Sequence, residues 1–238
     1  MKAMIMAAGK GTRLGKITDS VPKALVDING KSILRIAVEN CNCYGFDDVI
    51  INVHHFAEDV IREVQRLKMS GFRVSVSDES EELLETGGGL FKARHFFDEK
   101  PFLVYNCDII TDLNLSLLYE YHLQRKGIAT VAVRNRRGNR FLLVDNRGLL
   151  CGWTNVSTGE EIIARRSEEI PSKIAFSGIH VIDPLIFRYM KEGKFSLTTL
   201  YLSLAADNKI YTFRHDDGYW FDIGTPENLE IVRKTILE

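Results

Sequence analysis

The chain has 238 residues, of which 45% are hydrophobic and 26% are charged, and its formal net charge is −1. This length and composition predict one large α/β domain, or one domain with a small lid, around a sizeable buried core. The balanced charge argues against nucleic acid as the main partner, and no apolar run approaches the roughly 20 residues that span a bilayer.

Strand and helix patterns alternate over residues 2–77. Short apolar runs predict strands at Lys2–Ala8, Val49–Val53 and Phe72–Ser77. Apolar side chains at helical spacing predict helices at Ser32–Tyr44 and Ala57–Met69. A short extended segment, Ala24–Ile28, is expected between the first strand and the first helix. This order predicts a parallel sheet covered on both faces, in which ligands bind beyond the carboxyl ends of the strands.

The rest of the chain mixes strands, helices and one hairpin. Strands are expected at Pro101–Tyr105, Ile128–Arg134, Lys173–Asp183 and Lys209–Arg214. Helices are expected at Leu90–Phe97, Leu115–Gln124, Pro184–Met190, Ser196–Ala206 and from Pro226 onward. The hairpin joins Phe141–Val144 to Leu149–Trp153, and the polar segment Asn155–Pro171 is expected to be a solvated loop. No internal repeat or linker is present, so the second half is interpreted as an insertion and lid on the first.

The loop after the first strand is a candidate phosphate-binding site. The apolar run ends in Gly9-Lys10-Gly11-Thr12-Arg13, and glycines leave backbone N–H groups free of covering side chains. Arg13 and Lys23 add positive charge near this loop. We therefore expect it to grip a nucleoside triphosphate, although it matches neither the Walker A pattern nor GxGxxG.

Two aspartates, Asp108 and Asp222, each follow or end a predicted strand. At a phosphate site, two such carboxylates would make a good Mg²⁺ position, with water and phosphate oxygens completing the octahedron. Taken alone, Asp108 could instead be a simple helix cap or turn residue, which is the less favoured alternative. The three glycines Gly87–Gly89 at a predicted helix start are expected either to let a flat ring approach the backbone or to form a flexible turn.

Other chemistry-bearing residues are interpreted as ordinary. The cysteines at 41, 43, 107 and 151 form no CxxC repeat and are expected to be reduced thiols of a cytoplasmic protein. His54 and His55 lack a third group at metal-ligand spacing, and the first residues are expected to form a strand rather than a secretion signal.

Five short motifs, in this order, resemble the signature of sugar-1-phosphate nucleotidylyltransferases. They are Ala7–Arg13 with Pro22-Lys23, Glu85–Gly89, Asn106–Asp108, Phe176–Ile179 and Trp220–Thr225. The resemblance covers nearly the whole chain. It implies a Rossmann-like mixed, mainly parallel sheet with helices on both faces, of the nucleotide-diphospho-sugar transferase type, with a small sugar-binding insertion or lid. It also implies a single domain, 1–238, with a nucleotide-binding half at 1–110 and a sugar-binding half with the C-terminal helix at 111–238.

The resemblance implies roles for the matching positions. The nucleotide is expected to contact Ala7, Ala8, Gly9, Gly11, Thr12, Glu85, Thr86, Gly87 and Gly88. Arg13 and Lys23 are expected to bind phosphates during the transfer, and Asp108 with Asp222 to hold Mg²⁺. The sugar pocket is expected to be bordered by Asn106, Ser177 and Gly178.

The Glu-Thr-Gly-Gly-Gly form and the chain length are most similar to N-acetylmuramate-1-phosphate uridylyltransferases. UTP with N-acetylmuramate 1-phosphate or a related hexose 1-phosphate is therefore favoured. The alternatives are a GTP-using mannose- or heptose-1-phosphate guanylyltransferase, a phosphocholine-type cytidylyltransferase, and a catalytically inactive nucleotide-sugar sensor. The expected partners are a nucleoside triphosphate and a sugar 1-phosphate, and binding to nucleic acid or to a membrane is not expected. The protein is expected to be a monomer or a small homo-oligomer.

Three departures from the family pattern are visible, the first being Gly15-Lys16-Ile17-Thr18 where members often carry Arg-Pro-Leu-Thr. Cys107 stands where the family usually has glycine before the aspartate, and the Glu-Lys-Pro motif that binds the sugar phosphate in longer relatives is absent from the second half of the chain. The missing cation is expected to come from Arg165, Arg166 or Lys173.

Overall fold

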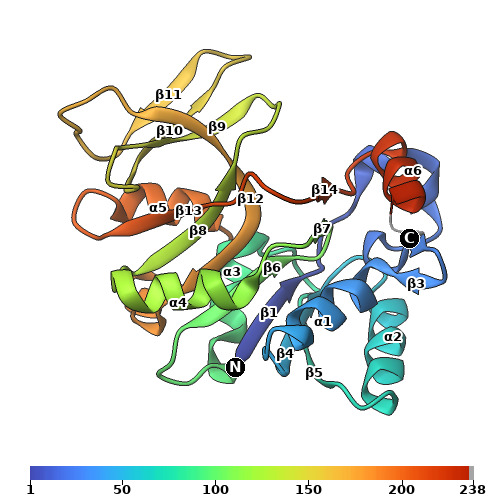
Figure 1. Cartoon of the computed structure of the whole chain (residues 1–238). Coiled ribbons are helices and arrows are strands. Elements are labelled where there is room, and N and C mark those ends of the chain that lie inside the picture. The colour runs from blue at the N-terminus through green and yellow to red at the C-terminus, as the bar shows by residue number, and fades with distance from the viewer. Residues whose placement is uncertain (236–238) are drawn as a thin grey trace.

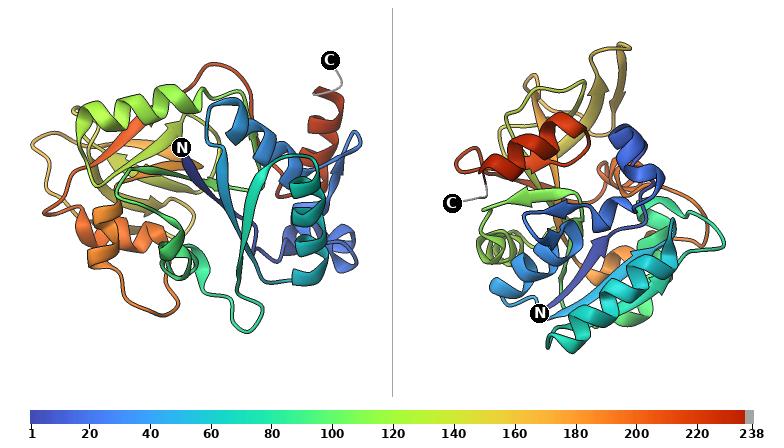
Figure 2. Two further views of the ribbon diagram at one scale, coloured as in Figure 1. Left: turned by 90° about the horizontal axis from the view of Figure 1, so that it is seen from below. Right: turned by 90° about the vertical axis from the view of Figure 1, so that its right-hand side faces the viewer.

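The structure is a computed structural model, and residues 1–235 are described here. In these residues, ten strands form one mixed sheet with helices on both faces (Figure 1, Figure 2). The strands are β1 (Lys2–Met6), β4 (Asp48–Val53), β5 (Arg73–Asp78), β6 (Phe102–Asn106), β8 (Ala129–Arg134), β9 (Arg140–Val144), β10 (Leu150–Asn155), β11 (Glu160–Ile163), β12 (Ser172–Ile182) and β13 (Ile210–Arg214). Their order is β11-β10-β9-β12-β6-β1-β4-β5, and β8 pairs with both β12 and β13.

The centre of the sheet is parallel. Strand β1 lies between β4 and β6 and is parallel to both, and β5 extends the parallel part beyond β4. Strand β12 then pairs antiparallel with β6, β8 and β9, which joins the second half of the chain to the same sheet. The expected mixed sheet is confirmed, and the carboxyl ends of β1, β4 and β6 meet at one edge, where ligands bind in such sheets.

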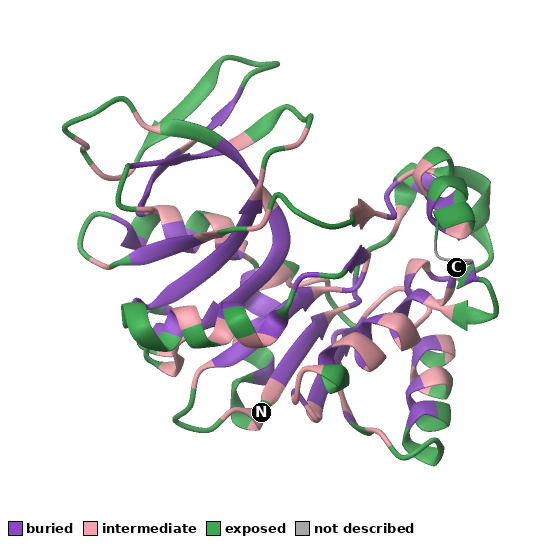
Figure 3. Ribbon diagram, in the orientation of Figure 1, coloured by how far each residue is buried: buried purple, intermediate pink, exposed green. Residues whose placement is uncertain are grey.

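Helices cover the two faces of the sheet and form two hydrophobic cores. They are α1 (Ile33–Cys43), α2 (Ala57–Met69), α3 (Glu85–Lys92), α4 (Leu115–Arg125), α5 (Leu197–Leu204) and α6 (Pro226–Thr235). Side chains of α1, α2, α4 and α6 belong to one core, and those of α3 and α5 to the other. Because strand side chains alternate, Ala3 and Ile5 face the first core and Met4 the second. This explains why the central strands, buried in Figure 3, read as continuous apolar runs.

Two small sheets lie outside the main one. Strands β2 (Asp27–Ile28) and β3 (Lys31–Ser32) form a short hairpin. Strand β7 (Ile109–Thr111) pairs antiparallel with β14 (Trp220–Asp222), with Asp222 opposite Ile109. The N–H of Ile223 also donates to the carbonyl of Asp108, at 2.8 Å. The last part of the described chain is thereby fixed beside the turn that follows β6.

Several predicted boundaries are wrong in the first half. The first strand ends at Met6, so Ala7 and Ala8 belong to the following loop, and residues Thr12–Asp19 form a 3-10 segment that was not predicted. Within the expected extended segment, Lys23–Leu25 is a 3-10 turn and only Asp27–Ile28 is a strand. The pattern of apolar residues does not predict these turns, because they depend on how the loop packs around Lys23.

The glycine triplet and the polar loop also differ from prediction. Gly87–Gly89 lie inside α3, which begins at Glu85 and ends at Lys92, rather than before a helix at Leu90–Phe97. A Cβ at Gly88 would lie 2.2 Å from the carbonyl oxygen of Gly193, so close backbone approach outweighs the low helix propensity of glycine. The expected loop Asn155–Pro171 contains β11, an exposed edge strand that pairs with β10.

None of the helices in residues 1–235 combines the length and the apolar character that crossing a bilayer requires.

Candidate active site

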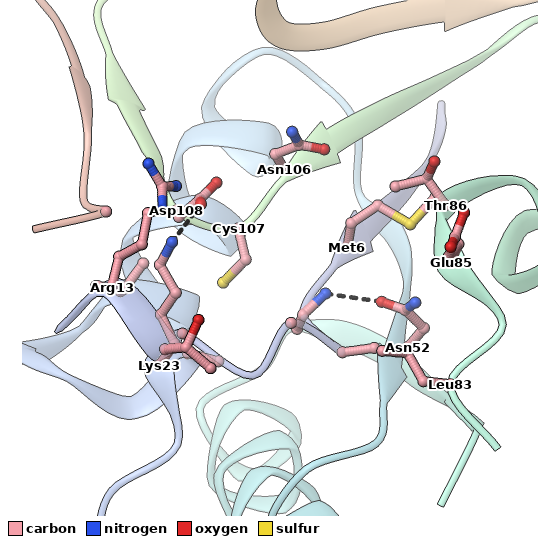
Figure 4. A pocket seen from close by; sticks show the side chains of 18 of the residues that line it. Met6, Arg13, Lys23, Asn52, Leu83, Glu85, Thr86, Asn106, Cys107 and Asp108 are labelled. Atoms are coloured by element: carbon pink, nitrogen blue, oxygen red, sulfur yellow. Dashed lines mark hydrogen bonds and ion pairs between the residues drawn. The ribbon is translucent and has the colours of Figure 1, made fainter. Parts of the chain in front are cut away.

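A cavity of about 450 Å³ lies at the carboxyl ends of β1, β4 and β6. The loop after β1, the start of α3 and the turn after β6 form its walls (Figure 4). Most of the residues expected at the site line this cavity: Ala7, Ala8, Gly9, Gly11, Thr12, Arg13, Lys23, Glu85, Thr86, Asn106 and Asp108. Segments that are distant in sequence thus converge where a parallel sheet presents its ligand edge.

The glycine loop brings Lys23 close to its own backbone. Gly11 adopts φ +68°, and a Cβ there would lie 2.9 Å from Lys23 Cβ and 3.0 Å from Thr18 Cγ2. The Thr18 hydroxyl donates to the carbonyl of Gly11 at 3.0 Å. Around Gly9, by contrast, no atom lies within 4 Å of where a Cβ would stand. Gly11 is therefore required for packing, whereas Gly9 leaves the loop open toward the cavity.

Two cations and two carboxylates meet beside the loop. Lys23 Nζ forms an ion pair with Asp108 Oδ2, and the two side chains are only 12% and 25% exposed. Arg13 Nη2 lies 3.7 Å from Asp222 Oδ2, although the Arg13 side chain is 65% exposed. Figure 4 shows Arg13 and Lys23 on the same wall as Asp108. The pairing of β7 with β14 brings Asp222 to this wall, although Asp222 does not itself line the cavity.

The pair Asp108 and Asp222 fits a divalent cation. Asp222 Oδ1 is buried and has no hydrogen-bond partner within residues 1–235. Burial raises the pKa of Asp222, and the neighbouring charge of Asp108 raises this pKa further. An unpartnered oxygen beside a like charge favours a cation there. The described residues hold no group of three or more His, Cys, Asp or Glu side chains placed to bind a metal, and two carboxylates suit Mg²⁺, which keeps several water ligands.

A buried polar chain behind the loop was not predicted from the sequence. The N–H of Ala7 donates to Asn52 Oδ1 at 2.7 Å, and Asn52 Nδ2 donates to Glu79 Oε1 at 2.8 Å. Glu79 is fully buried, and its Oε2 accepts a 3.4 Å hydrogen bond from the N–H of Leu84. The chain therefore links the loop after β1 to the segment before α3 across the cavity. The sequence held one indication of this chain of hydrogen bonds, the polar Asn52 within the otherwise apolar strand β4.

Replacing Glu79 with glutamine should change how stability depends on pH. Burial raises the pKa of Glu79, so the native state retains the proton above the pH at which the unfolded chain loses it. The contribution of this group to stability is full below its unfolded pKa and is lost as pH rises through its folded pKa, by about 1.4 kcal/mol per unit of difference. Urea unfolding at pH 5 and pH 8 should show a smaller loss on alkalinisation in Glu79→Gln than in the wild type. An equal loss in the two proteins would contradict this.

The glycines at the start of α3 do not line the cavity. The N–H groups of Gly87 and Gly88 both donate to the carbonyl of Phe195, at 2.8 and 3.2 Å. Their hydrogen-bonding capacity is therefore used to fasten α3 to the segment before α5. Only Glu85 and Thr86 of this motif reach the cavity.

Two residues expected to border the sugar, Ser177 and Gly178, also lie outside the cavity lining. Ser177 is fully buried, with its hydroxyl 2.7 Å from His215 Nε2. Gly178 has φ +83°, and a Cβ there would lie 2.7 Å from Ile109 Cγ1. Both residues pack β12 against the β7–β14 segment, whereas Asn106 does line the cavity.

A family model and curated relatives that match this sequence are all nucleotidyl transferases. The family model for nucleotidyl transferases matches residues 2–238. An N-acetylmuramate alpha-1-phosphate uridylyltransferase from Caulobacter vibrioides is 27% identical over 235 residues, which are 94% of this chain and 92% of that one. A mannose-1-phosphate guanyltransferase from Yarrowia lipolytica is 28% identical over 96% of this chain, which spans only 62% of that relative.

A solved structure shares the fold. HddC from Yersinia pseudotuberculosis, complexed with GMP-PN, superposes with a TM-score of 0.76 over 98% of both chains, at 22% sequence identity. At this identity, the likeness concerns the fold.

Proposed function

The chain belongs to the nucleotidyl transferase family, and from this premise we propose that it joins a sugar 1-phosphate to a nucleoside triphosphate and releases pyrophosphate. The family and its relatives support sugar-1-phosphate nucleotidylyltransferase activity. One observation supports the proposal most strongly: the glycine loop, Arg13, Lys23 and Asp108 line the same wall of the cavity. Asp222 lies beside this wall, where the pairing of β14 with β7 holds it.

The proposed reaction is an in-line displacement. A phosphate oxygen of the sugar 1-phosphate attacks the α-phosphorus, a new P–O bond forms, and the bond between the α-phosphorus and the leaving pyrophosphate breaks. The nucleophile is already anionic at neutral pH, so no general base is required. Arg13 and Lys23 would stabilise the negative charge that develops on the α-phosphate and the pyrophosphate, and the glycine loop would orient the triphosphate.

Family members generally use a divalent metal ion, and we assign Mg²⁺ to Asp108 and Asp222. When bound, the ion would neutralise phosphate charge and orient the reacting groups. The unpartnered oxygen of Asp222 supports the assignment. The contribution of the chain itself is to pair Asp222 of β14 with Ile109 of β7, which holds Asp222 beside Asp108, the residue that precedes β7.

For the substrates, we favour UTP with N-acetylmuramate 1-phosphate or a related hexose 1-phosphate. Support comes from the Caulobacter relative, of whose length this chain spans 92%. GTP with mannose 1-phosphate is the second candidate, supported by the Yarrowia relative. The division into a nucleotide half and a sugar half, the cytoplasmic location and the oligomeric state stay predictions.

A pyrophosphate-release assay tests the proposal. The protein is incubated with Mg²⁺ and each of UTP, GTP, CTP and dTTP, in combination with the 1-phosphates of glucose, mannose, N-acetylglucosamine and N-acetylmuramic acid, and with phosphocholine. We expect release with UTP and one of the sugar phosphates, abolished by chelation of the metal. Release with GTP and mannose 1-phosphate would select the second candidate, and release only with CTP and phosphocholine would indicate a cytidylyltransferase. If no combination released pyrophosphate, the proposed enzymatic activity would be contradicted. A catalytically inactive nucleotide-sugar sensor would then be the remaining alternative.

A further inference from the structure

A second cavity adjoins the first on the side of the second half of the chain. It has a volume of about 550 Å³, and its lining includes Arg136, Trp153, Phe176 and Ser196. Ser196 also lines the first cavity, so the two spaces share a wall. The second cavity therefore lies next to the first, and its lining combines arginine side chains with half-buried aromatic rings.

Two arginines, Arg136 and Arg140, line this cavity, and Arg136 is the half-buried one, with a free donor on its guanidinium. The guanidinium carbon lies 4.9 Å from the centre of the Trp220 ring, and Nη2 donates to the carbonyl of Phe176 at 3.2 Å. Its Nε is buried and has no hydrogen-bond partner within residues 1–235. None of the ion pairs among these residues includes Arg136. A half-buried guanidinium that lacks a carboxylate partner favours an anionic ligand, because desolvating an unpaired charge is costly.

The position of Arg136 connects this cation to the reaction site. Burial lowers the pKa of Arg136, and the nearby carboxylate of Asp222 opposes this shift. Trp220, on which the guanidinium rests, is in the same strand β14 as Asp222. An anion bound by Arg136 would thus lie beside the carboxylate pair rather than at the far end of the second cavity.

The cations expected from the sequence are placed differently. Arg165 donates from Nε to the carbonyl of Ala205 at 2.7 Å and from Nη2 to the carbonyl of Asn208 at 2.9 Å. Neither Arg166 nor Lys173 lines either of the two cavities. Arg136 therefore has a position in the cavity lining that these three residues lack.

We propose that Arg136 binds the phosphate of the sugar 1-phosphate and that the adjoining cavity holds the sugar ring against Phe176 and Trp153. The proposal rests on the proposed function for the identity of the anion. A planar guanidinium can bind two phosphate oxygens at once, which would fix the direction of the attacking oxygen. In this chain, Arg136 would replace the lysine of the missing Glu-Lys-Pro motif.

The kinetic test compares Arg136→Ala and Arg136→Lys with Arg137→Ala, whose exposed side chain lies one position further along the same loop. We expect Arg136→Ala to raise KM for the sugar 1-phosphate by about 10- to 100-fold, the range for losing a charged hydrogen bond, and to leave KM for the nucleotide within twofold. Arg136→Lys should recover part of the loss, and Arg137→Ala should match the wild type. A proportional rise in both KM values would indicate a structural role and overturn the proposal.

A binding measurement separates this proposal from the proposed function. Isothermal titration of the same proteins with the four sugar 1-phosphates of the assay panel requires no turnover. At least one should bind the wild type and Arg137→Ala, and should bind Arg136→Ala at least tenfold more weakly, while UTP binds all of them equally. If binding depended on Arg136 in this way but no pyrophosphate were released in the assay, the anion site would be supported and the proposed enzymatic activity would be refuted. Equal binding to Arg136→Ala, or no binding of any sugar 1-phosphate to the wild type, would overturn the role of Arg136.

Discussion

Replacing Asp222 with asparagine should lower kcat by about a thousandfold, the upper range for removing one electrostatic contact to a transition state, without lowering the free energy of unfolding. The carboxylate is largely buried, and its Oδ1 has no hydrogen-bond partner in residues 1–235. Burial and the charge of Asp108 also raise its pKa, which means that its ionisation is less favourable in the folded chain than in the unfolded one. A side chain that is kept charged at a cost to stability is typical of a functional site.

The measurements are pyrophosphate release at saturating substrates and urea unfolding of the same preparations. Asp217→Asn is the matched control, because it removes an exposed carboxylate from the segment just before β14. Asp108→Asn should lose as much activity as Asp222→Asn, but it should also lose some stability because Lys23 would keep no carboxylate partner. Turnover of Asp222→Asn within tenfold of the wild type would refute the metal assignment.

Replacing Lys23 with alanine should lower kcat by at least a hundredfold. The lysine is mostly buried between the glycine loop and Asp108, so its ammonium group is held in position before any phosphate arrives. Its loss removes the charge that would stabilise the developing oxyanions and leaves Asp108 without its partner. Lys23→Arg should not restore the rate, because Gly11 packs tightly against the lysine side chain and the guanidinium is larger.

Lys16→Ala provides the control for this second prediction, since it removes an exposed lysine from the neighbouring 3-10 segment. Rates are compared on protein that circular dichroism shows to be folded, because loss of the ion pair is also expected to cost about 1–3 kcal/mol of stability. If Lys23→Ala kept more than a fifth of the wild-type kcat, Lys23 would be a structural partner of Asp108 rather than a group that acts on phosphate.

The parts of the fold and site that depend on local pattern could be predicted from the sequence. The strands around β1 are apolar runs because both faces of the sheet are covered, and glycine marks the turn that exposes backbone to the cavity. Asp108 was expected at the carboxyl end of a central strand and lies two residues beyond β6. These positions follow from periodicity and from the geometry of parallel sheets alone.

The parts that depend on contacts between distant segments could not be predicted. A Cβ at Gly88 would meet the carbonyl of Gly193, and Ser177 contacts two distant residues, His215 through its hydroxyl and Trp220 through its carbonyl. Glu79 reads as an ordinary charged residue, and only the fold shows its carboxylate buried against Asn52. In each case the partner is far away in the sequence, and no local rule identifies it.

The pairing of β7 with β14 determines when the site is complete during synthesis. Asp108 and Asp222 are more than 100 residues apart in the sequence, and contacts of such separation form only after a long loop has closed. At an elongation rate of roughly 5–20 residues per second, the glycine loop and β1 leave the ribosome many seconds before Trp220–Asp222 do. A nascent chain can therefore acquire a nucleotide-binding loop well before it acquires the second carboxylate. Under the proposed function, turnover would begin only after the β14 segment has emerged from the ribosome and paired with β7.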